Sequence, residues 1–287
     1  STLLASSAAS DVYKRQMYCN AAGTSISELF LAGFLPGVLI ALCLMIYSYI
    51  YCKIHGEDKA KLNAQWQELR SRGLGTVLKE GFWALLSPVI ILGGIYGGIC
   101  SPTEAATISI FYSLIISLFV YRTIKIRDLP KILLEGIHSY APILIILSAA
   151  VAFARVITLM NVASVVSEAV LSAISSKVVI LLLINVLLLF VGMIMDTGPA
   201  ILVFTPVLLP VTEALGVDPI HFGIIMCVNL AIGFVTPPMG ANLFVASNLS
   251  KVPVIEIAKK AVPFILAFLV ALMLITFIPE ISLFLVK

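Results

Sequence analysis

Long apolar runs separated by short polar loops dominate the chain. Most of these runs approach the roughly 20 residues that an α-helix needs to cross the hydrocarbon core of a membrane. None alternates with the period of two that is typical of outer-membrane strands. The pattern therefore predicts an all-α, polytopic membrane protein. The predicted apolar segments are residues 31–51, 82–100, 105–121, 139–160, 178–195, 200–211, 221–235 and 262–285.

The polar loops between these segments predict the orientation of the chain. Lys and Arg concentrate in short loops on the cytoplasmic side of membrane proteins. We therefore expect residues 53–80, 122–131 and 251–260 to face the cytoplasm, and the turn SPTEA at 101–105 to face the other side. The basic residues that carry this prediction in the first loop are Lys53, Lys59, Lys61, Arg70, Arg72 and Lys79.

Two short sequences interrupt the apolar pattern in the second half of the chain. The first, DTGP at 196–199, precedes segment 200–211, which is only about 18 Å long as a helix and too short to span comfortably. Because this tip carries no Lys or Arg, we expect it to be buried in a re-entrant hairpin that opens to the outside. The second, TPP at 236–238, removes two backbone donors and predicts a helix broken near mid-membrane.

Composition agrees with a membrane protein and excludes several functions. The chain is 61% hydrophobic and 11% charged, with a mean hydropathy of +1.11, which leaves too little polar surface for a water-soluble globule. The net charge of +3 is small and gives no reason to expect nucleic acid as a partner. The five cysteines and three histidines lack metal-ligand spacing, so we expect no metal site other than one for sodium.

The candidate chemistry lies at the two interruptions. An aspartate in the middle of a membrane helix costs roughly 2.5–3.5 kcal/mol on insertion scales, so Asp196 is expected to be functional. Helix C-termini offer carbonyl oxygens to a hard cation, whereas helix N-termini suit an anion. Thr197 and Thr236 add side-chain oxygens, and Gly198 permits close approach of the backbone. We therefore predict a sodium ion beside an anionic substrate.

Several other interpretations stay open at this point. Asp196 could pair with Arg155 as a structural ion pair, and prolines kink ordinary helices. DTG also occurs in aspartic proteases, but that chemistry needs two carboxylates, and the other aspartates lie in polar connections. SPTEA reads as a plain turn in which a Ser or Thr and Glu104 cap the next helix. A purely structural assembly subunit would leave both breaks without a purpose.

Three asparagines interrupt the apolar segments, and the ends of two segments resemble one another. Asn185, Asn229 and Asn242 are each costly in lipid, so each should face protein or a cavity, and only Asn242 lies near the predicted site. Residues 25–46 and 252–275 both contain a short stretch with one Glu, then a proline, then a membrane span. Such internal repeats are common in secondary transporters.

Four motifs resemble one known family. GTSISELFLAGFLPG, GGIYGGICSPTEAA, MDTGPAILVFTPVLLPV and LGVDPIHFGIIMCVNLAIGFVTPPMGANLFVAS are similar to the large membrane subunit (DctM type) of tripartite ATP-independent periplasmic (TRAP) transporters. The resemblance covers residues 17–287. It implies an elevator-type fold of the ion-transporter superfamily with inverted repeats. It also implies sodium-coupled import of organic acids such as C4-dicarboxylates or sialic acid. A stand-alone sodium–carboxylate symporter is the alternative.

The resemblance further implies partners and a location. The permease would lie in the bacterial inner membrane and would work with a small TRAP membrane subunit and a periplasmic substrate-binding protein. Family members have more segments upstream of Tyr18, where this chain has STLLASSAASDVYKRQ. We expect that stretch to be a sequencing or assembly artefact and the chain to be a C-terminal fragment that lacks most of the first repeat. The protein is not expected to be an enzyme. No cofactor is expected besides the coupling sodium ion.

The breaks and the resemblance together assign the site and the domains. The predicted sodium-binding residues are Asp196, Thr197, Gly198, Gly233, Thr236 and Pro237, and the predicted substrate-binding residues are Pro199, Pro238, Gly240 and Asn242. The expected domains are a leader (1–16), the end of the first repeat (17–52), a cytoplasmic loop (53–80), scaffold and arm helices (81–176), the transport-domain hairpin and broken helix (177–250), and an amphipathic segment with the final membrane helix (251–287).

Overall fold

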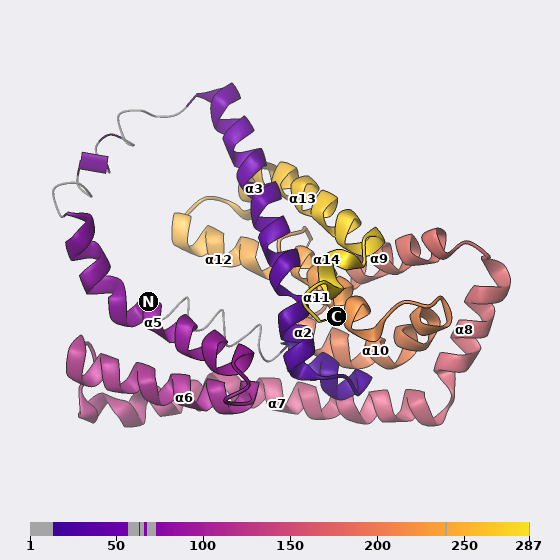
Figure 1. Cartoon of the computed structure of the whole chain (residues 1–287), viewed down its shortest axis with the longest axis horizontal. Coiled ribbons are helices and arrows are strands. Elements are labelled where there is room, and N and C mark those ends of the chain that lie inside the picture. Colours follow the sequence, from indigo (N-terminus) through magenta and orange to yellow (C-terminus); the bar gives the residue numbers. More distant parts are fainter. Residues whose placement is uncertain (1–13, 57–62, 64–65, 68–72, 239, 287) are drawn as a thin grey trace. The chain divides into compact units, whose positions relative to one another are not determined.

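The computed structural model describes residues 14–56, 63, 66–67, 73–238 and 240–286, and the described elements are helices (Figure 1). Residues 14–22 are helical. Most of the predicted leader, and residues 57–62, 64–65 and 68–72 of the predicted cytoplasmic loop, lie outside the described residues. The remaining helices are α2 (Ile26–Ala32), α3 (Phe34–His55), α5 (Leu74–Tyr96), α6 (Pro102–Ile115), the π-helix η1 (Ile116–Val120), the 3-10 helix η2 (Ile126–Asp128), α7 (Leu129–Leu159), α8 (Val162–Ala173), α9 (Lys177–Ile194), α10 (Thr197–Ala214), α11 (Pro219–Gly233), α12 (Ala241–Ser250), α13 (Val254–Phe277) and α14 (Glu280–Leu283).

The described helices support a multi-pass membrane protein. Five of them are long and apolar enough to cross a membrane, and a sixth span results if residues 144–159 of α7 and α8 are counted together. These two helices meet at a bend of 64°. Asn161 lies at the bend with a left-handed backbone (φ 53°), a conformation that asparagine tolerates better than most residues. The all-helical prediction is therefore confirmed.

The length predicted for the second arm of the hairpin is wrong. Helix α10 begins directly after Asp196 and ends at Ala214, so it has 18 residues and not the 12 of segment 200–211. At 1.5 Å per residue it is about 27 Å long. It extends this far because Asp196 caps its start, Pro199 fits its first turn, and Pro206 and Pro210 lie inside it without ending it. Length by itself therefore does not make this arm re-entrant.

Other helix boundaries also differ from the predictions. Helix α7 begins at Leu129, ten residues before the predicted start, and the less apolar stretch after it forms α8. The predicted amphipathic stretch and the final span are one continuous helix, α13, which contains Pro263 and ends at Phe277. Amphipathic stretches and spans are both helical, so hydropathy alone does not locate the boundary between them.

The chain divides into two compact units. One contains the described parts of Ser48–Ala141, and the other contains the described parts of Tyr13–Tyr47 and Pro142–Lys287. In the first unit, α5 packs against α6, and the Tyr112 hydroxyl donates to the Trp83 carbonyl (2.7 Å). The turn before α6 is the capping box expected from SPTEA: Glu104 Oε2 accepts from the Ser101 backbone N–H (2.8 Å).

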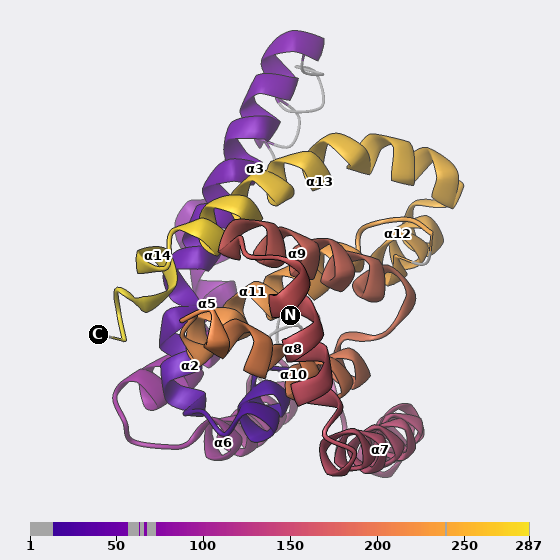
Figure 2. The same ribbon diagram turned by 90° about the vertical axis from the view of Figure 1, so that its right-hand side faces the viewer.

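The core of the second unit lies around α9, α10 and α11. Asn229 of α11 bonds to Asn185 of α9, and further along both helices Gly192 meets Leu230 and Gly233, so α9 and α11 run in the same direction. A short turn joins α10 to α11, and Thr205 contacts Met226 across this pair, so α10 runs in the opposite direction. Figure 2 shows α10 and α11 side by side.

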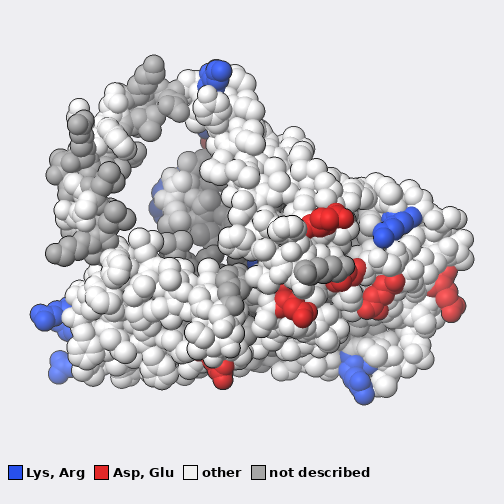
Figure 3. All heavy atoms as spheres, in the orientation of Figure 1, with Lys and Arg blue, Asp and Glu red and all other residues white. Residues whose placement is uncertain are grey.

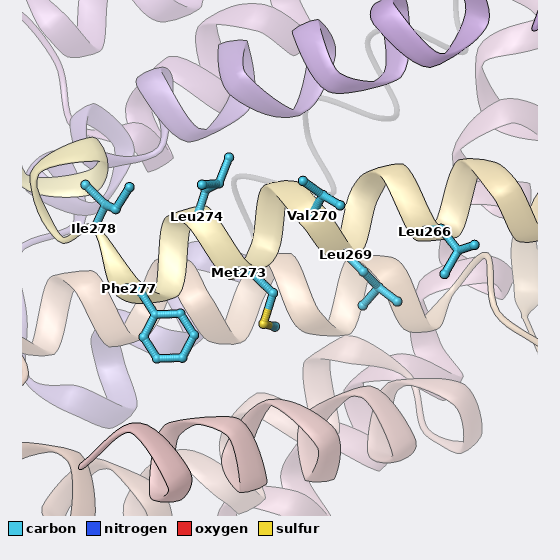
Figure 4. A pocket seen from close by; sticks show the side chains of 7 residues that line it. All are labelled: Leu266, Leu269, Val270, Met273, Leu274, Phe277 and Ile278. Atoms are coloured by element: carbon cyan, nitrogen blue, oxygen red, sulfur yellow. The ribbon is translucent and has the colours of Figure 1, made fainter. Parts of the chain in front are cut away.

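Apolar side chains cover much of the surface of the described residues. Figure 3 shows that charged side chains are sparse on the face it presents. An apolar groove of about 460 Å³ runs along α13 (Figure 4). Exposed apolar side chains at this density are expected where lipid or another membrane-embedded chain is the surrounding medium. The groove is lined by Leu266, Leu269, Val270, Met273, Leu274, Phe277 and Ile278.

Candidate functional site

Asp196 occupies the sharp link between α9 and α10. Helix α9 ends at Ile194, and Asp196 is the N-cap of α10 with an extended backbone (φ −65°, ψ 148°). Its Oδ1 accepts a hydrogen bond from the Thr197 backbone N–H (2.8 Å). The side chain is exposed on the described surface. A carboxylate at this position therefore stabilises the start of α10 and keeps further lone pairs for another ligand.

Thr197 is the most unusual polar group at the tip. Its side chain is 2% exposed, and its hydroxyl has no hydrogen-bond partner among the described residues. Leaving a buried hydroxyl unpaired costs about 1–3 kcal/mol, so such groups are rare unless something else binds them. Gly198 is also buried, and a Cβ there would lie 3.3 Å from the thioether of Met17. Pro199 is half-buried in the first turn.

The second interruption separates α11 from α12, as predicted. Helix α11 ends at Gly233 and α12 begins at Ala241. The Thr236 hydroxyl donates to the Ile232 carbonyl (2.7 Å) and so satisfies one of the last carbonyls of α11. Pro237 and Pro238 are exposed. The described part of the break, residues 234–238, is therefore a turn and not a simple proline kink.

Two backbone carbonyls of the break converge on Gly240. A Cβ at this position would lie 3.0 Å from the oxygens of both Phe234 and Thr236. The Phe234 oxygen also accepts from the Asn242 backbone N–H (3.2 Å), whereas the Asn242 side chain is exposed. A side chain here would be in tight contact with these carbonyls, which glycine avoids. The break thus presents backbone oxygens, which are the ligands that a hard cation prefers.

The structure brings the tip and the break to the same end of the second unit. Helices α9 and α11 run in the same direction and meet near their C-termini, where a Cβ on Gly233 would overlap the backbone of Gly192. Asp196 follows this crossing on one chain segment, and Thr236 follows it on the other. The ends of α9 and α11 are negative ends of helix dipoles, and the start of α10 is a positive end. The arrangement suits a cation with an anion nearby.

Several alternatives are not supported by this geometry. Asp196 and Arg155 form no ion pair among the described residues. Asp218 caps α11 at the far end of that helix, and Asp128 lies in η2 of the other unit. Asp11 and Asp58 lie outside the described residues. Within the second unit, Asp196 and Asp218 therefore do not form the pair that an aspartic protease needs.

Some relevant residues were not found by sequence reasoning. Gly192 matters because it allows α9 and α11 to approach closely, and Met17 because it packs on Gly198. A glycine in an apolar helix and a methionine near a span carry no sequence signal for such contacts. Asn185 and Asn229 were expected to face protein, and both are buried, which confirms that prediction.

Two cavities in the second unit are lined by residues other than those of the predicted site. The apolar groove on α13 offers no polar group to an organic acid. A hollow of about 590 Å³ lies against α8 and α10, and Glu168 would repel an anion there. Its other lining residues are Ala21, Thr158, Asn161, Ala163, Ser164, Ser167, Pro206 and Pro210.

Comparison with known proteins identifies the family. Residues 14–281 match the family described as "Tripartite ATP-independent periplasmic transporter, DctM component". The chain is 43% identical over 272 residues to the isethionate TRAP transporter permease protein DctMQ of Oleidesulfovibrio alaskensis. It is 39% identical over 267 residues to the C4-dicarboxylate TRAP transporter large permease protein DctM of Pseudomonas aeruginosa, and 35% identical over 269 residues to the sialic acid TRAP transporter large permease protein SiaM of Vibrio cholerae.

These matches cover nearly all of this chain but only part of each relative. They include 93%, 93% and 94% of this chain, and 41%, 61% and 62% of the three relatives, respectively. The family match extends over both compact units and includes every residue of the tip and of the break. The chain therefore belongs to the DctM family of TRAP transporter large permeases, which are multi-pass membrane proteins and not enzymes.

Proposed function

We propose that this chain forms part of a permease that imports an organic acid together with sodium. The relatives are named for isethionate, C4-dicarboxylates and sialic acid, which are all organic anions. The helix N-termini at the tip and at the break suit a carboxylate or sulfonate group. We assign Pro199, Pro238, Gly240 and Asn242 to the substrate side.

One observation carries the sodium assignment. The buried Thr197 hydroxyl has no partner among the described residues, Thr197 follows Asp196 in the chain, and the carbonyl-lined break lies at the same end of the unit. Sodium is a hard cation that binds oxygen, and these groups supply hydroxyl, carboxylate and carbonyl oxygens. We assign Asp196, Thr197, Gly198, Gly233, Thr236 and Pro237 to this site.

We further propose that the hairpin of α9 and α10 is re-entrant, so that its tip lies inside the membrane. The absence of Lys and Arg from 195–211 and the unpaired polar atom at the tip support this placement. Sodium binding would order the tip and complete the substrate site. Residues 177–250 would then move against a scaffold that includes α5 and α6, which lie in the other compact unit.

The proposal also includes the partners and the location. A small TRAP membrane subunit and a periplasmic substrate-binding protein would complete the system in the bacterial inner membrane. Membership of a tripartite family supports the existence of further components. Residues 53–80 would face the cytoplasm, 81–176 would contain scaffold and arm helices, and 251–287 would contain the final membrane helix.

The test is sodium-dependent uptake of labelled organic acids into proteoliposomes, using the transporter to which this chain belongs with its binding protein. Asp196→Asn should raise the half-saturating sodium concentration about tenfold, which corresponds to about 1.4 kcal/mol of binding free energy. Asparagine is also a good N-cap, so α10 should still form.

Asp218→Asn is the matched control. Asp218 is likewise an N-cap aspartate whose Oδ1 accepts from a backbone N–H, but it lies at the opposite end of α11. We expect this variant to keep the sodium dependence of the wild type. Equal sodium dependence in both variants would contradict the site. Uptake that does not require the binding protein would instead indicate a stand-alone sodium–carboxylate symporter.

A further inference from the structure

A chain of buried hydrogen bonds links α9, α11 and α13. The Asn229 side-chain amide donates to Asn185 Oδ1 (2.6 Å), and the Asn185 amide donates to Thr276 Oγ1 (3.1 Å). The Thr276 hydroxyl in turn donates to the Leu272 carbonyl (2.8 Å). All three side chains are at most 2% exposed. We call Asn185, Asn229 and Thr276 the amide network.

The amide network allows only one alignment of the three helices. Burying an amide without hydrogen bonds in apolar surroundings costs free energy. Here the Asn185 amide, Asn185 Oδ1 and the Asn229 amide are bonded, whereas Asn229 Oδ1 has no partner among the described residues. Neighbouring buried positions on α9 and α11, such as Ile184, Leu188 and Ile225, are apolar. A shift of α9 along α11 by one turn would place an apolar side chain opposite each asparagine. Sliding or rotation therefore breaks the network at a cost that apolar packing alone would not impose.

A second contact lies on the same helix pair, closer to the predicted site. Gly192 follows Asn185 by seven residues, and its Cβ position lies 3.1 Å from the Leu230 Cα and 3.3 Å from the Gly233 Cα. Two separated contacts between the same pair of helices determine both the position of one helix along the axis of the other and the rotation of each helix about its own axis. Helix α9 leads into Asp196 with only Met195 after its last residue, so this alignment also determines the level of the tip.

We infer that Asn185, Asn229 and Thr276 are positioning residues for the proposed sodium site. Asp196 lies eleven residues beyond Asn185, about 16 Å along the chain if helical, and Thr236 lies seven residues beyond Asn229, about 10 Å. The network therefore does not touch the ion. It holds the tip and the break at the positions along the helix axes where their oxygens face one ion. This inference rests on the proposed function.

The test removes the interhelical acceptor and preserves the shape of the side chain. Thr276→Val keeps a β-branched side chain but leaves the Asn185 amide without its partner on α13. The half-saturating sodium concentration for uptake should rise at least about fivefold, a typical coupling between linked sites. The half-saturating substrate concentration at saturating sodium should not change. Thr276→Ser restores the hydroxyl and should restore the sodium dependence of the wild type.

Thr212→Val is the matched control. Thr212 is also fully buried in the same unit, but its hydroxyl donates only within its own helix, to the Leu209 carbonyl. We expect its half-saturating sodium concentration to stay within about twofold of the wild type, because no interhelical bond is lost. If Thr276→Val does not fold, Asn185→Ala removes the same bond from α9 and must give the same shift.

Two results would overturn the inference, and they differ from each other. If the wild type depends on sodium but Thr276→Val or Asn185→Ala shifts no more than Thr212→Val, then only the positioning role is wrong. If uptake by the wild type itself does not depend on sodium, the proposed function fails, and the inference that rests on it fails with it.

Discussion

At the residue scale, the proposed sodium site depends on the Thr197 hydroxyl, one of several buried hydroxyls without a partner among the described residues. Thr197 is buried beside Asp196, yet its Oγ1 has no hydrogen-bond partner among the described residues. The Asp196 carboxylate has a structural role, because it caps the start of α10. The threonine hydroxyl has no such structural role, so it is the better test of ion binding.

Thr197→Val should distinguish a structural role of the hydroxyl from a role in sodium binding, because the two roles predict different changes in stability with and without sodium. Without sodium, the melting temperature should stay equal or rise, because the variant removes an unpaired buried polar group that costs about 1–3 kcal/mol. In the wild type, sodium above its dissociation constant should add about 1.4 kcal/mol of stability for each tenfold increase in concentration. The valine variant should lose most of this stabilisation.

The measurement is thermal unfolding in detergent, with sodium chloride compared with choline chloride at equal ionic strength. Thr197→Ser keeps the hydroxyl and should keep part of the sodium effect. Stabilisation of the valine variant by sodium to the same extent as the wild type would remove Thr197 from the site.

At the scale of the elements, the close crossing of α9 and α11 places the tip beside the break. The crossing requires glycine at position 233, because a Cβ there would lie 2.6 Å from the Gly192 Cα, whereas a Cβ on Gly192 would be in tight contact, 3.1 Å from the Leu230 Cα. We assigned Gly233 to the sodium site, and its contact with Gly192 shows that it also has a packing role. The Gly233 carbonyl accepts from the Thr236 N–H (3.0 Å), so the same residue begins the turn of the break.

Gly233→Ala should therefore destabilise the protein by about 1–3 kcal/mol, which is typical of overpacking in a close-packed interior. Gly37→Ala is the control, because its Cβ position in α3 has no atom within 4 Å. Replacing a glycine inside a helix with alanine at such an open position should stabilise by about 0.5–1 kcal/mol. Thermal unfolding followed by circular dichroism measures both, and equal stability of the two variants would contradict the crossing.

At the scale of the whole molecule, the proposed orientation can be read from two native cysteines. Cys52 lies near the end of α3, next to the basic loop 53–80, and Cys100 lies in the turn between α5 and α6. Both thiols are free and partly exposed. The positive-inside rule places the first on the cytoplasmic side and the second outside.

A membrane-impermeant thiol reagent should therefore label Cys100 in intact cells and Cys52 only after the membrane is opened. Mass spectrometry of the labelled peptides measures this, and the variants Cys100→Ser and Cys52→Ser identify each signal. Labelling of Cys52 in intact cells would reverse the orientation and with it the direction of the proposed import.

Much of the fold follows from local sequence patterns. The apolar segments predicted the membrane helices because burial in lipid requires nearly continuous apolar residues. Pro237 and Pro238 predicted the break, and Ser101 with Glu104 predicted the start of α6. Helix ends were less well predicted: α10 continues through Pro206 and Pro210, which sequence rules treat as breakers.

The sequence by itself determined the class of the protein, its family, and the two interruptions that hold the candidate site. Composition, hydropathy and local motifs carry that information because each depends on neighbouring residues. Only the tertiary structure showed that Asp196 and Thr236 lie at one end of the same unit. It also showed that Thr197 Oγ1 is buried with no partner in the described part of the chain, and that hydrogen bonds join Asn185, Asn229 and Thr276. These facts depend on the direction and alignment of helices far apart in the chain, and packing alone decides them.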